Sequence, residues 1–132
     1  MLLLHPFSEA AIGRLASQHR VLYLPGVPDA LVDEPMAATV LDEAGVPSAI
    51  VVGQEVAVQL AARRPARVAA LVLLQPSVVG GRILPSLRLP TLIVVAELGS
   101  GRALLRTVAG AELAVAEEAG WPEAILAFTA NL

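Results

Sequence analysis

The stretch Val51-Val52-Gly53-Gln54-Glu55-Val56-Ala57 decides the fold. An apolar run stops at a glycine, and the residues that follow it are apolar at helical spacing as far as Ala61. A short apolar run that leads at once into a helix is typical of a buried strand in a parallel sheet. The stretch therefore predicts a strand over residues 48–52, a tight turn at Gly53, and a helix that ends before Pro65.

The same alternation continues towards both ends of the chain. Ser8 is suited to cap one of the further helices, and Pro35 and Pro122 are suited to the first turns of two others. Residues 77–90 lack a helical pattern, and we expect a loop there, either a lid over a binding site or a plain crossover. A short helix is expected around residues 104–108. The remaining apolar runs predict strands over residues 2–4, 21–24, 69–74, 91–95 and 112–116.

Strands that are apolar on both faces and alternate with helices indicate a parallel sheet covered on both sides. We predict an α/β fold in a single domain over residues 1–132, built as a three-layer sandwich with a mostly parallel sheet of about six strands. In such sheets, ligands bind at the carboxyl ends of the strands where the strand order reverses. If the first strand is central, that rule brings the residues after the first strand, His5 to Phe7, opposite those after the third, Gly53 to Ala57.

Composition excludes several kinds of chemistry. Cysteine and lysine are both absent, which rules out disulfides, thiolate metal sites and lysine-based catalysis. Two histidines leave little room for a metal site, and we expect neither a metal nor a cofactor. The formal net charge of −3 argues against electrostatic binding of nucleic acid.

Hydropathy bears on the cellular setting. Hydrophobic residues make up 56% of the chain and charged residues only 16%, but no apolar run is long enough for a membrane helix. The first six residues lack the basic start of a signal peptide, so we expect a cytoplasmic protein that does not contact a membrane. The excess of apolar residues predicts a subunit contact, and we expect a homodimer formed through the unpaired edge of the strand over residues 21–24.

Several segments together resemble the α/β-hydrolase superfamily. The stretch from Val51 to Ala57 resembles the nucleophile elbow of that family, a strained strand-to-helix turn with the pattern G-x-S-x-G. The resemblance covers nearly the whole chain and implies the strand order 2-1-3-4-5-6. The other matches are Leu3-Leu4-His5-Pro6 with the family's oxyanion strand end, Leu22-Tyr23-Leu24-Pro25-Gly26 with the strand before its D-x-P-G turn, Leu89 to Glu97 with the strand that carries the acid, and Glu118 to Ala124 with the segment that carries the histidine.

The departures from the family pattern concern its catalytic residues. Glu55 occupies the position of the nucleophile, and Ala57 occupies that of the second glycine. The resemblance would place the acid near Gly99, after Ala96-Glu97-Leu98, and that position holds no carboxylate. No histidine stands between Gly120 and Trp121. The family's first two strands have no counterpart, and its cap is reduced to residues 77–89. The resemblance thus implies a minimal, capless member, a trimmed core without the Ser-His-Asp triad.

Two hypotheses of function follow. The first is a non-hydrolytic binding or scaffold protein, a pseudoenzyme that takes a small-molecule ligand. The second is a small enzyme with Glu55 and His5 as catalytic residues, acting on an ester, lactone, epoxide or cyclising substrate. A flavodoxin-like phosphate-binding protein ranks third, because a glycine-rich loop does not follow the first strand. The candidate binding residues are Gln54, Phe7, Val56, Ser77 and Trp121, with the N–H groups of Phe7 and Val56 as an oxyanion-type pair.

Each candidate also has a purely structural interpretation. The helix dipole favours a glutamate in a first helical turn, and a histidine at a strand end often bonds a backbone carbonyl. Gln54 would then be a solvated residue, Ser77 a turn residue, and Trp121 an anchor for the last helix. A basic cluster beyond the end of the third helix is interpreted as solvated; it consists of Arg63, Arg64 and Arg67.

Overall fold

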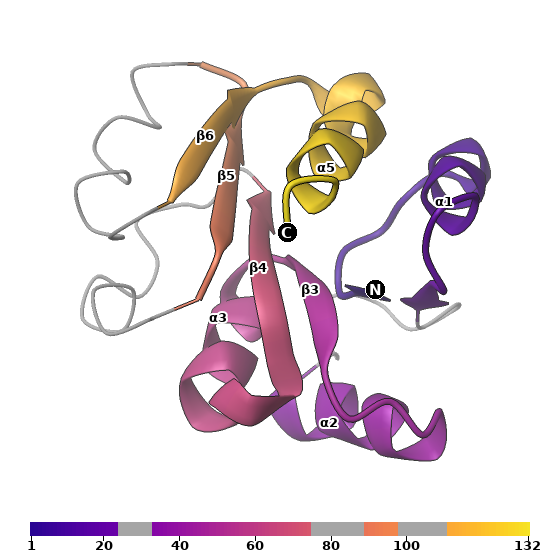
Figure 1. The fold of residues 1–132 in the computed structure, drawn as a ribbon, viewed down its shortest axis with the longest axis vertical. Helices are drawn as coiled ribbons and strands as arrows, with labels where there is room; N and C mark the ends of the chain where they lie inside the picture. The colour runs from indigo at the N-terminus through magenta and orange to yellow at the C-terminus, as the bar shows by residue number, and fades with distance from the viewer. Residues whose placement is uncertain (24–32, 75–88, 98–110) are drawn as a thin grey trace.

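The computed structural model describes residues 1–23, 33–74, 89–97 and 111–132, which form one sheet with helices on both sides (Figure 1). The sheet has six parallel strands in the order β2-β1-β3-β4-β5-β6. The predicted α/β class, parallel sheet and strand order are confirmed. The strands are β1 (Leu2–Leu3), β2 (Leu22–Tyr23), β3 (Ala49–Gly53), β4 (Val68–Leu74), β5 (Thr91–Val95) and β6 (Glu112–Val115). The helices are α1 (Glu9–Ala16), α2 (Glu34–Glu43), α3 (Glu55–Arg63) and α5 (Trp121–Thr129), with 3-10 turns η2 (Pro65–Arg67) and η4 (Glu118–Gly120).

Helices α2 and α3 pack on one face of the sheet, and α1 and α5 pack on the other (Figure 1). On the first face their buried residues form one apolar core with strand residues such as Val51 and Leu71. On the second face the core includes the next residue of each strand, Val52 and Val72. Successive strand residues are therefore buried on opposite sides, which explains why these strands are apolar throughout. The three-layer sandwich is confirmed.

Local signals set the ends of the helices. The Ser8 hydroxyl accepts a hydrogen bond from Ala11 N at 3.1 Å and so caps α1, as the sequence predicts. Asp33 caps α2 in the same way, with its carboxylate accepting from Met36 N at 2.9 Å. Gly45 follows α2 with a φ of 69°, a left-handed conformation that glycine adopts without steric cost.

The three arginines at and just beyond the end of α3 are ion-paired, and Arg63 and Arg64 remain exposed to solvent, as expected of a solvated cluster. Arg64 donates a hydrogen bond to the Glu34 carboxylate, and Arg63 lies 3.8 Å from the same group. Arg67 donates to Asp42 at 2.7 Å. Glu34 is 3% exposed, and a buried carboxylate requires a compensating cation. These pairs therefore tie α2 to the end of α3.

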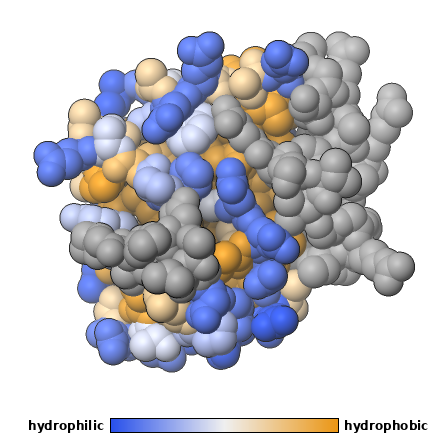
Figure 2. All heavy atoms as spheres, turned by 180° about the vertical axis from the view of Figure 1, so that it is seen from behind, coloured by the Kyte–Doolittle hydropathy of each residue, from blue (hydrophilic) through white to orange (hydrophobic). Residues whose placement is uncertain are grey.

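Strands β2 and β6 form the two edges of the described sheet, and each carries an exposed large hydrophobic residue. Tyr23 on β2 is 47% exposed and Val115 on β6 is 54% exposed. Apolar surface also lies between hydrophilic side chains on the face drawn in Figure 2. Within the described ranges, no helix has the length and apolar character to cross a membrane. The helix expected around residues 104–108, and the expected loop apart from its last two residues, lie outside the described residues.

Candidate functional site

The turn between β3 and α3 is fixed by close packing of small residues. Gly53 is buried, and a Cβ at this position would lie 3.1 Å from Leu4 Cβ and 3.4 Å from Ala57 Cβ. The backbone N–H of Leu4 also donates to Val52 O at 2.8 Å. Because Gly53 and Ala57 are small, the start of α3 can approach the end of β1. The residue after Leu4, His5, therefore lies beside the turn.

Gln54, Glu55 and Val56 follow Gly53 at the carboxyl edge of the sheet. The side-chain amide of Gln54 donates to the carbonyl oxygen of Leu74 at 3.1 Å, which ties the turn to the last residue of β4. Glu55 is the first residue of α3 and its side chain is exposed, while Val56 is half-buried. The partial positive charge at a helix N-terminus stabilises an ionised carboxylate at this position.

Three aromatic rings from separate segments meet beside this turn. His5 follows β1, Phe7 precedes α1, and Trp121 is the first residue of α5. The His5 ring lies 5.5 Å from the Trp121 ring and 6.4 Å from the Phe7 ring, in both cases edge-on. The Phe7 and Trp121 rings are 5.8 Å apart. Edge-on aromatic pairs at these separations are attractive, so the three rings position one another.

Trp121 is almost entirely buried, with 4% of its surface exposed. It belongs to the core beneath α5, as expected of an anchor for that helix. Within the described chain, its indole Nε1 is a buried polar atom with no hydrogen-bond partner. A buried donor without a partner costs about 1–3 kcal/mol, which the packing of the ring must offset.

The other histidine, His19, lies near the amino ends of the strands, away from the turn at Gly53. His19 Nε2 is 3.0 Å from Thr129 Oγ1, at the end of α5. The next residue, Arg20, accepts a hydrogen bond from the Met1 amino group at 2.7 Å through its carbonyl. Burial lowers the pKa of that amino group, and the charge of Arg20 lowers it further. His5 is therefore the histidine that accompanies the turn at Gly53.

A cavity of about 480 Å³ opens beside Phe7, between α1 and the start of α5. Arg14 and Glu123 form an ion pair of 2.6 Å across this region. We call this cavity the Phe7 cavity. Its lining residues are Phe7, Ser8, Ala10, Ala11, Arg14, Glu118, Ala119, Pro122 and Glu123. Sequence reasoning missed Arg14 and Glu123 as neighbours, although both are charges in the terminal turns of helices that the predicted strand order places on one face.

The structure thus brings the predicted site residues together in two groups at the carboxyl edge. Gln54, Glu55 and Val56 form the turn, and His5, Phe7 and Trp121 form the aromatic cluster. Ser77 lies outside the described residues. In the described part of the chain, no three His, Asp or Glu side chains gather as a metal ion would need.

No protein-family model and no curated protein matches the sequence. Solved structures do match. Carboxylesterase CesB (YbfK) from Bacillus subtilis aligns with a TM-score of 0.78 and 14% identity over 99% of this chain and 83% of the other. A variant of the meta-cleavage product hydrolase CumD aligns with a TM-score of 0.77 and 12% identity over 99% of this chain and 90% of the other. A hydrolase from Pseudomonas aeruginosa PA01 aligns with a TM-score of 0.71 and 15% identity over 92% and 83%. The chain therefore has the α/β-hydrolase fold.

Proposed function

We propose that this chain is a non-hydrolytic binding protein built on the α/β-hydrolase fold. Its ligand is a small molecule held in the Phe7 cavity. The ligand carries an apolar part that packs against Phe7 and Pro122, and a polar part that reaches Arg14 or Glu118.

The strongest support comes from the packing of Trp121 against His5. Acyl transfer by this fold needs a histidine that can exchange protons with the residue at the elbow. The His5 ring instead packs edge-on against two aromatic rings, 5.5 Å from Trp121 and 6.4 Å from Phe7. A ring held in this way serves packing better than proton transfer, which favours binding over catalysis.

The residues of the turn give further support. The Gln54 amide is engaged with Leu74 O, and the Glu55 side chain is exposed at the start of α3. A carboxylate that is solvated by water is a weaker nucleophile than a desolvated one, so the exposure of Glu55 favours binding over covalent catalysis. Phe7 contributes to both the aromatic cluster and the cavity wall, so a ligand in the cavity would contact the same ring that packs on Trp121.

One observation favours a second candidate function. Leu4 packs against Gly53, so the histidine after Leu4 and the carboxylate of Glu55 follow neighbouring strand ends at the same edge. In a small enzyme, Glu55 would attack an ester, lactone or epoxide and His5 would activate the water that releases the product. This alternative predicts turnover that depends on Glu55.

The first test is turnover of short-chain activated esters, lactones and epoxides by the wild type, Glu55→Gln and Glu9→Gln. Glu9 is a matched control because it is also an exposed first residue of a helix at this edge. We expect no turnover above the buffer blank in any of the three proteins. Turnover that is lost in Glu55→Gln and kept in Glu9→Gln, with circular dichroism unchanged, would overturn the proposal and establish the enzyme.

The second test is binding, followed by the fluorescence of the single tryptophan, Trp121. Titration with the same esters, lactones and epoxides should give a saturable change for at least one class. Phe7→Ala should abolish that change, whereas Tyr23→Ala removes an aromatic ring on the β2 edge and should leave it intact. A response that is absent for every compound, or equal in Phe7→Ala, contradicts binding at this cavity.

A further inference from the structure

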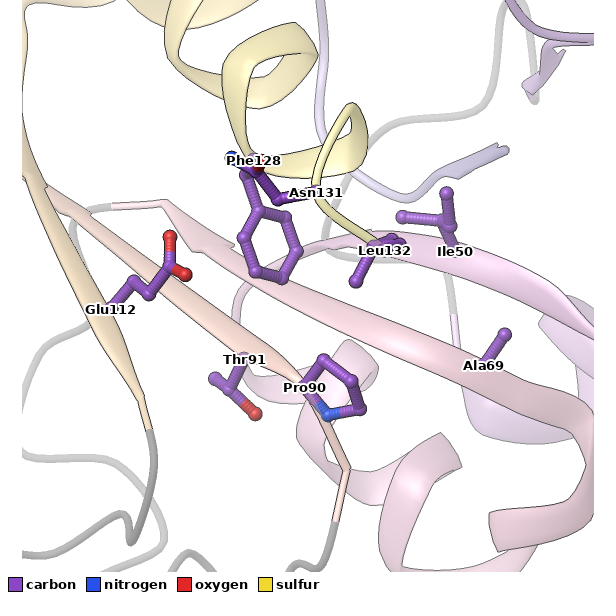
Figure 3. A pocket seen from close by; sticks show the side chains of 8 residues that line it. All are labelled: Ile50, Ala69, Pro90, Thr91, Glu112, Phe128, Asn131 and Leu132. Carbon is purple, nitrogen blue, oxygen red and sulfur yellow. The ribbon is translucent and has the colours of Figure 1, made fainter.

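A second cavity, of about 590 Å³, lies where the strands begin, at the opposite end of the strands from Glu55 (Figure 3). The strand residues that line it are the first or second of their strands: Ile50, Ala69, Thr91 and Glu112. The end of α5 covers it with Phe128 and Asn131. We call it the basal cavity. Its volume lies within the range of about 300–1,000 Å³ typical of small-molecule sites.

A β-bulge opens this cavity. Ala49 pairs with Val68 and Ile50 pairs with Ala70, so Ala69 has no partner across the ladder. The unpaired residue is exposed, and its side chain is only a methyl group. Bulges of this kind interrupt a strand locally and are frequent beside binding sites. Space therefore remains between the start of β4 and the end of α5.

Three polar side chains line the basal cavity, and each offers an acceptor oxygen. Glu112 is the one charged side chain among its lining residues, and its carboxylate extends towards the Phe128 ring (Figure 3). The Asn131 amide nitrogen donates one of its two hydrogens to Ala127 O at 3.1 Å, and the amide oxygen is an acceptor. The Thr91 hydroxyl donates to Leu89 O at 3.1 Å, so its oxygen can offer only lone pairs.

The helix that covers the cavity adds to the negative electrostatic potential at these acceptor groups. Helix α5 ends over the basal cavity, and its last turn carries no basic residue. The negative end of the helix dipole therefore reinforces the charge of Glu112. The Phe128 ring presents an apolar wall, and an aromatic face attracts cations. A ligand that suits these walls combines a positive charge with an apolar body.

We propose that the basal cavity binds a small organic ammonium ion with an aromatic or alkyl body. The ammonium group donates hydrogen bonds to Glu112 and the Asn131 oxygen, and the body packs against Phe128 and Ile50. This site is independent of the proposed function, since it lies at the other edge of the sheet and shares no residue with the Phe7 cavity.

Titration of the ¹⁵N-labelled protein with three probes of similar body and different charge tests this site. The probes are phenethylammonium, 2-phenylethanol and 3-phenylpropionate, followed by chemical-shift changes in ¹H–¹⁵N spectra. We expect saturable shifts at Ala69, Glu112 and Asn131 with the ammonium ion. The alcohol should bind about tenfold more weakly, and the carboxylate should not bind.

Two variants sharpen the test. Glu112→Gln should weaken phenethylammonium binding about tenfold, whereas Glu117→Gln, just beyond the other end of β6, should leave it unchanged. Ala69→Leu should fill the cavity and abolish binding of both the ammonium ion and the alcohol. Equal affinity for the three probes would overturn the proposal, and so would unchanged binding by Glu112→Gln. Because Glu112 is exposed, that variant keeps the test valid even if Ala69→Leu does not fold.

Discussion

Leu4 and Gly53 are in contact at the ends of two neighbouring parallel strands, and a Cβ on Gly53 would lie 3.1 Å from Leu4 Cβ. This separation is shorter than ordinary carbon–carbon contacts of about 3.5–4.0 Å. A side chain on Gly53 would therefore require Leu4 to move away by a few tenths of an ångström. The turn at the carboxyl edge of the sheet depends on this close approach.

We predict that Gly53→Val lowers the free energy of unfolding by about 1–3 kcal/mol, because the added methyl groups must displace Leu4 or Ala57. Urea denaturation followed by circular dichroism measures the change. Gly13→Ala is the control, since a Cβ at Gly13 meets nothing within 4 Å. Alanine is also the better helix former there, so the control should be neutral or more stable by about 0.5–1 kcal/mol. Equal effects of the two substitutions would contradict the packing argument.

Loss of the buried carboxylate of Glu34 should lower the free energy of unfolding more than loss of an exposed carboxylate. Glu34→Gln removes the charge that Arg64 and Arg63 neutralise, and we expect a loss of about 1–3 kcal/mol in chemical denaturation. The loss of stability is limited because the side chain of Arg64 is 44% exposed and can be solvated by water when its partner is neutral. Glu123→Gln breaks the ion pair with Arg14, whose two side chains are about half exposed. That loss should stay below about 1 kcal/mol, and the reverse order of the two effects would refute the prediction.

Two substitutions at Trp121 should distinguish the contribution of its ring to stability from that of its N–H group. Trp121→Ala removes a buried aromatic side chain and should cost about 3–5 kcal/mol. Trp121→Phe keeps a ring against His5 and removes the unpartnered Nε1 donor, so the lost contact area and the relieved polar group nearly cancel. We expect Trp121→Phe to stay within about 1 kcal/mol of the wild type by thermal and urea unfolding. A large loss in Trp121→Phe would mean that the N–H group is satisfied in solution.

We further predict a homodimer formed through the β2 edge. Tyr23, 47% exposed on this strand, would lie in the contact, and Tyr23→Lys should give a monomer by placing a charge there. Val115→Lys makes the same change on the β6 edge, where the side chain is 54% exposed, and should leave the dimer intact. Light scattering after gel filtration at micromolar concentration distinguishes the two states. A monomeric wild type would contradict the prediction.

The sequence predicts the strands and helices well because burial determines which positions along the chain are apolar. Strands that are covered on both faces have to be apolar at every position, and the runs ending at Gly53 and Leu74 carry that pattern into the structure. The cap at Ser8 is predictable for a different reason, because the hydroxyl and its Ala11 partner are only three residues apart in the chain. The strand order came from the resemblance to a family, because periodicity alone does not fix which strands are neighbours.

The candidate site was less predictable because its contacts join distant parts of the chain. The hydrogen bond from Gln54 to Leu74 spans 20 residues, and elsewhere in the fold the contact between Arg64 and Glu34 spans 30. Such partners depend on side-chain rotamers and helix packing, which composition and spacing do not encode. The bulge at Ala69 is a further case, since one unpaired residue leaves the apolar pattern of its strand almost unchanged.

The turn between β3 and α3 owes its shape to residues other than the one at its apex. Leu4, Gly53 and Ala57 make the close contacts, while the side chain of Glu55 is exposed. The residues that hold the turn in place are therefore different from the residue at the position of the family's nucleophile, Glu55. Evolution or a protein engineer can replace the apex side chain at little cost in stability, and can try new chemistry on a backbone that stays the same.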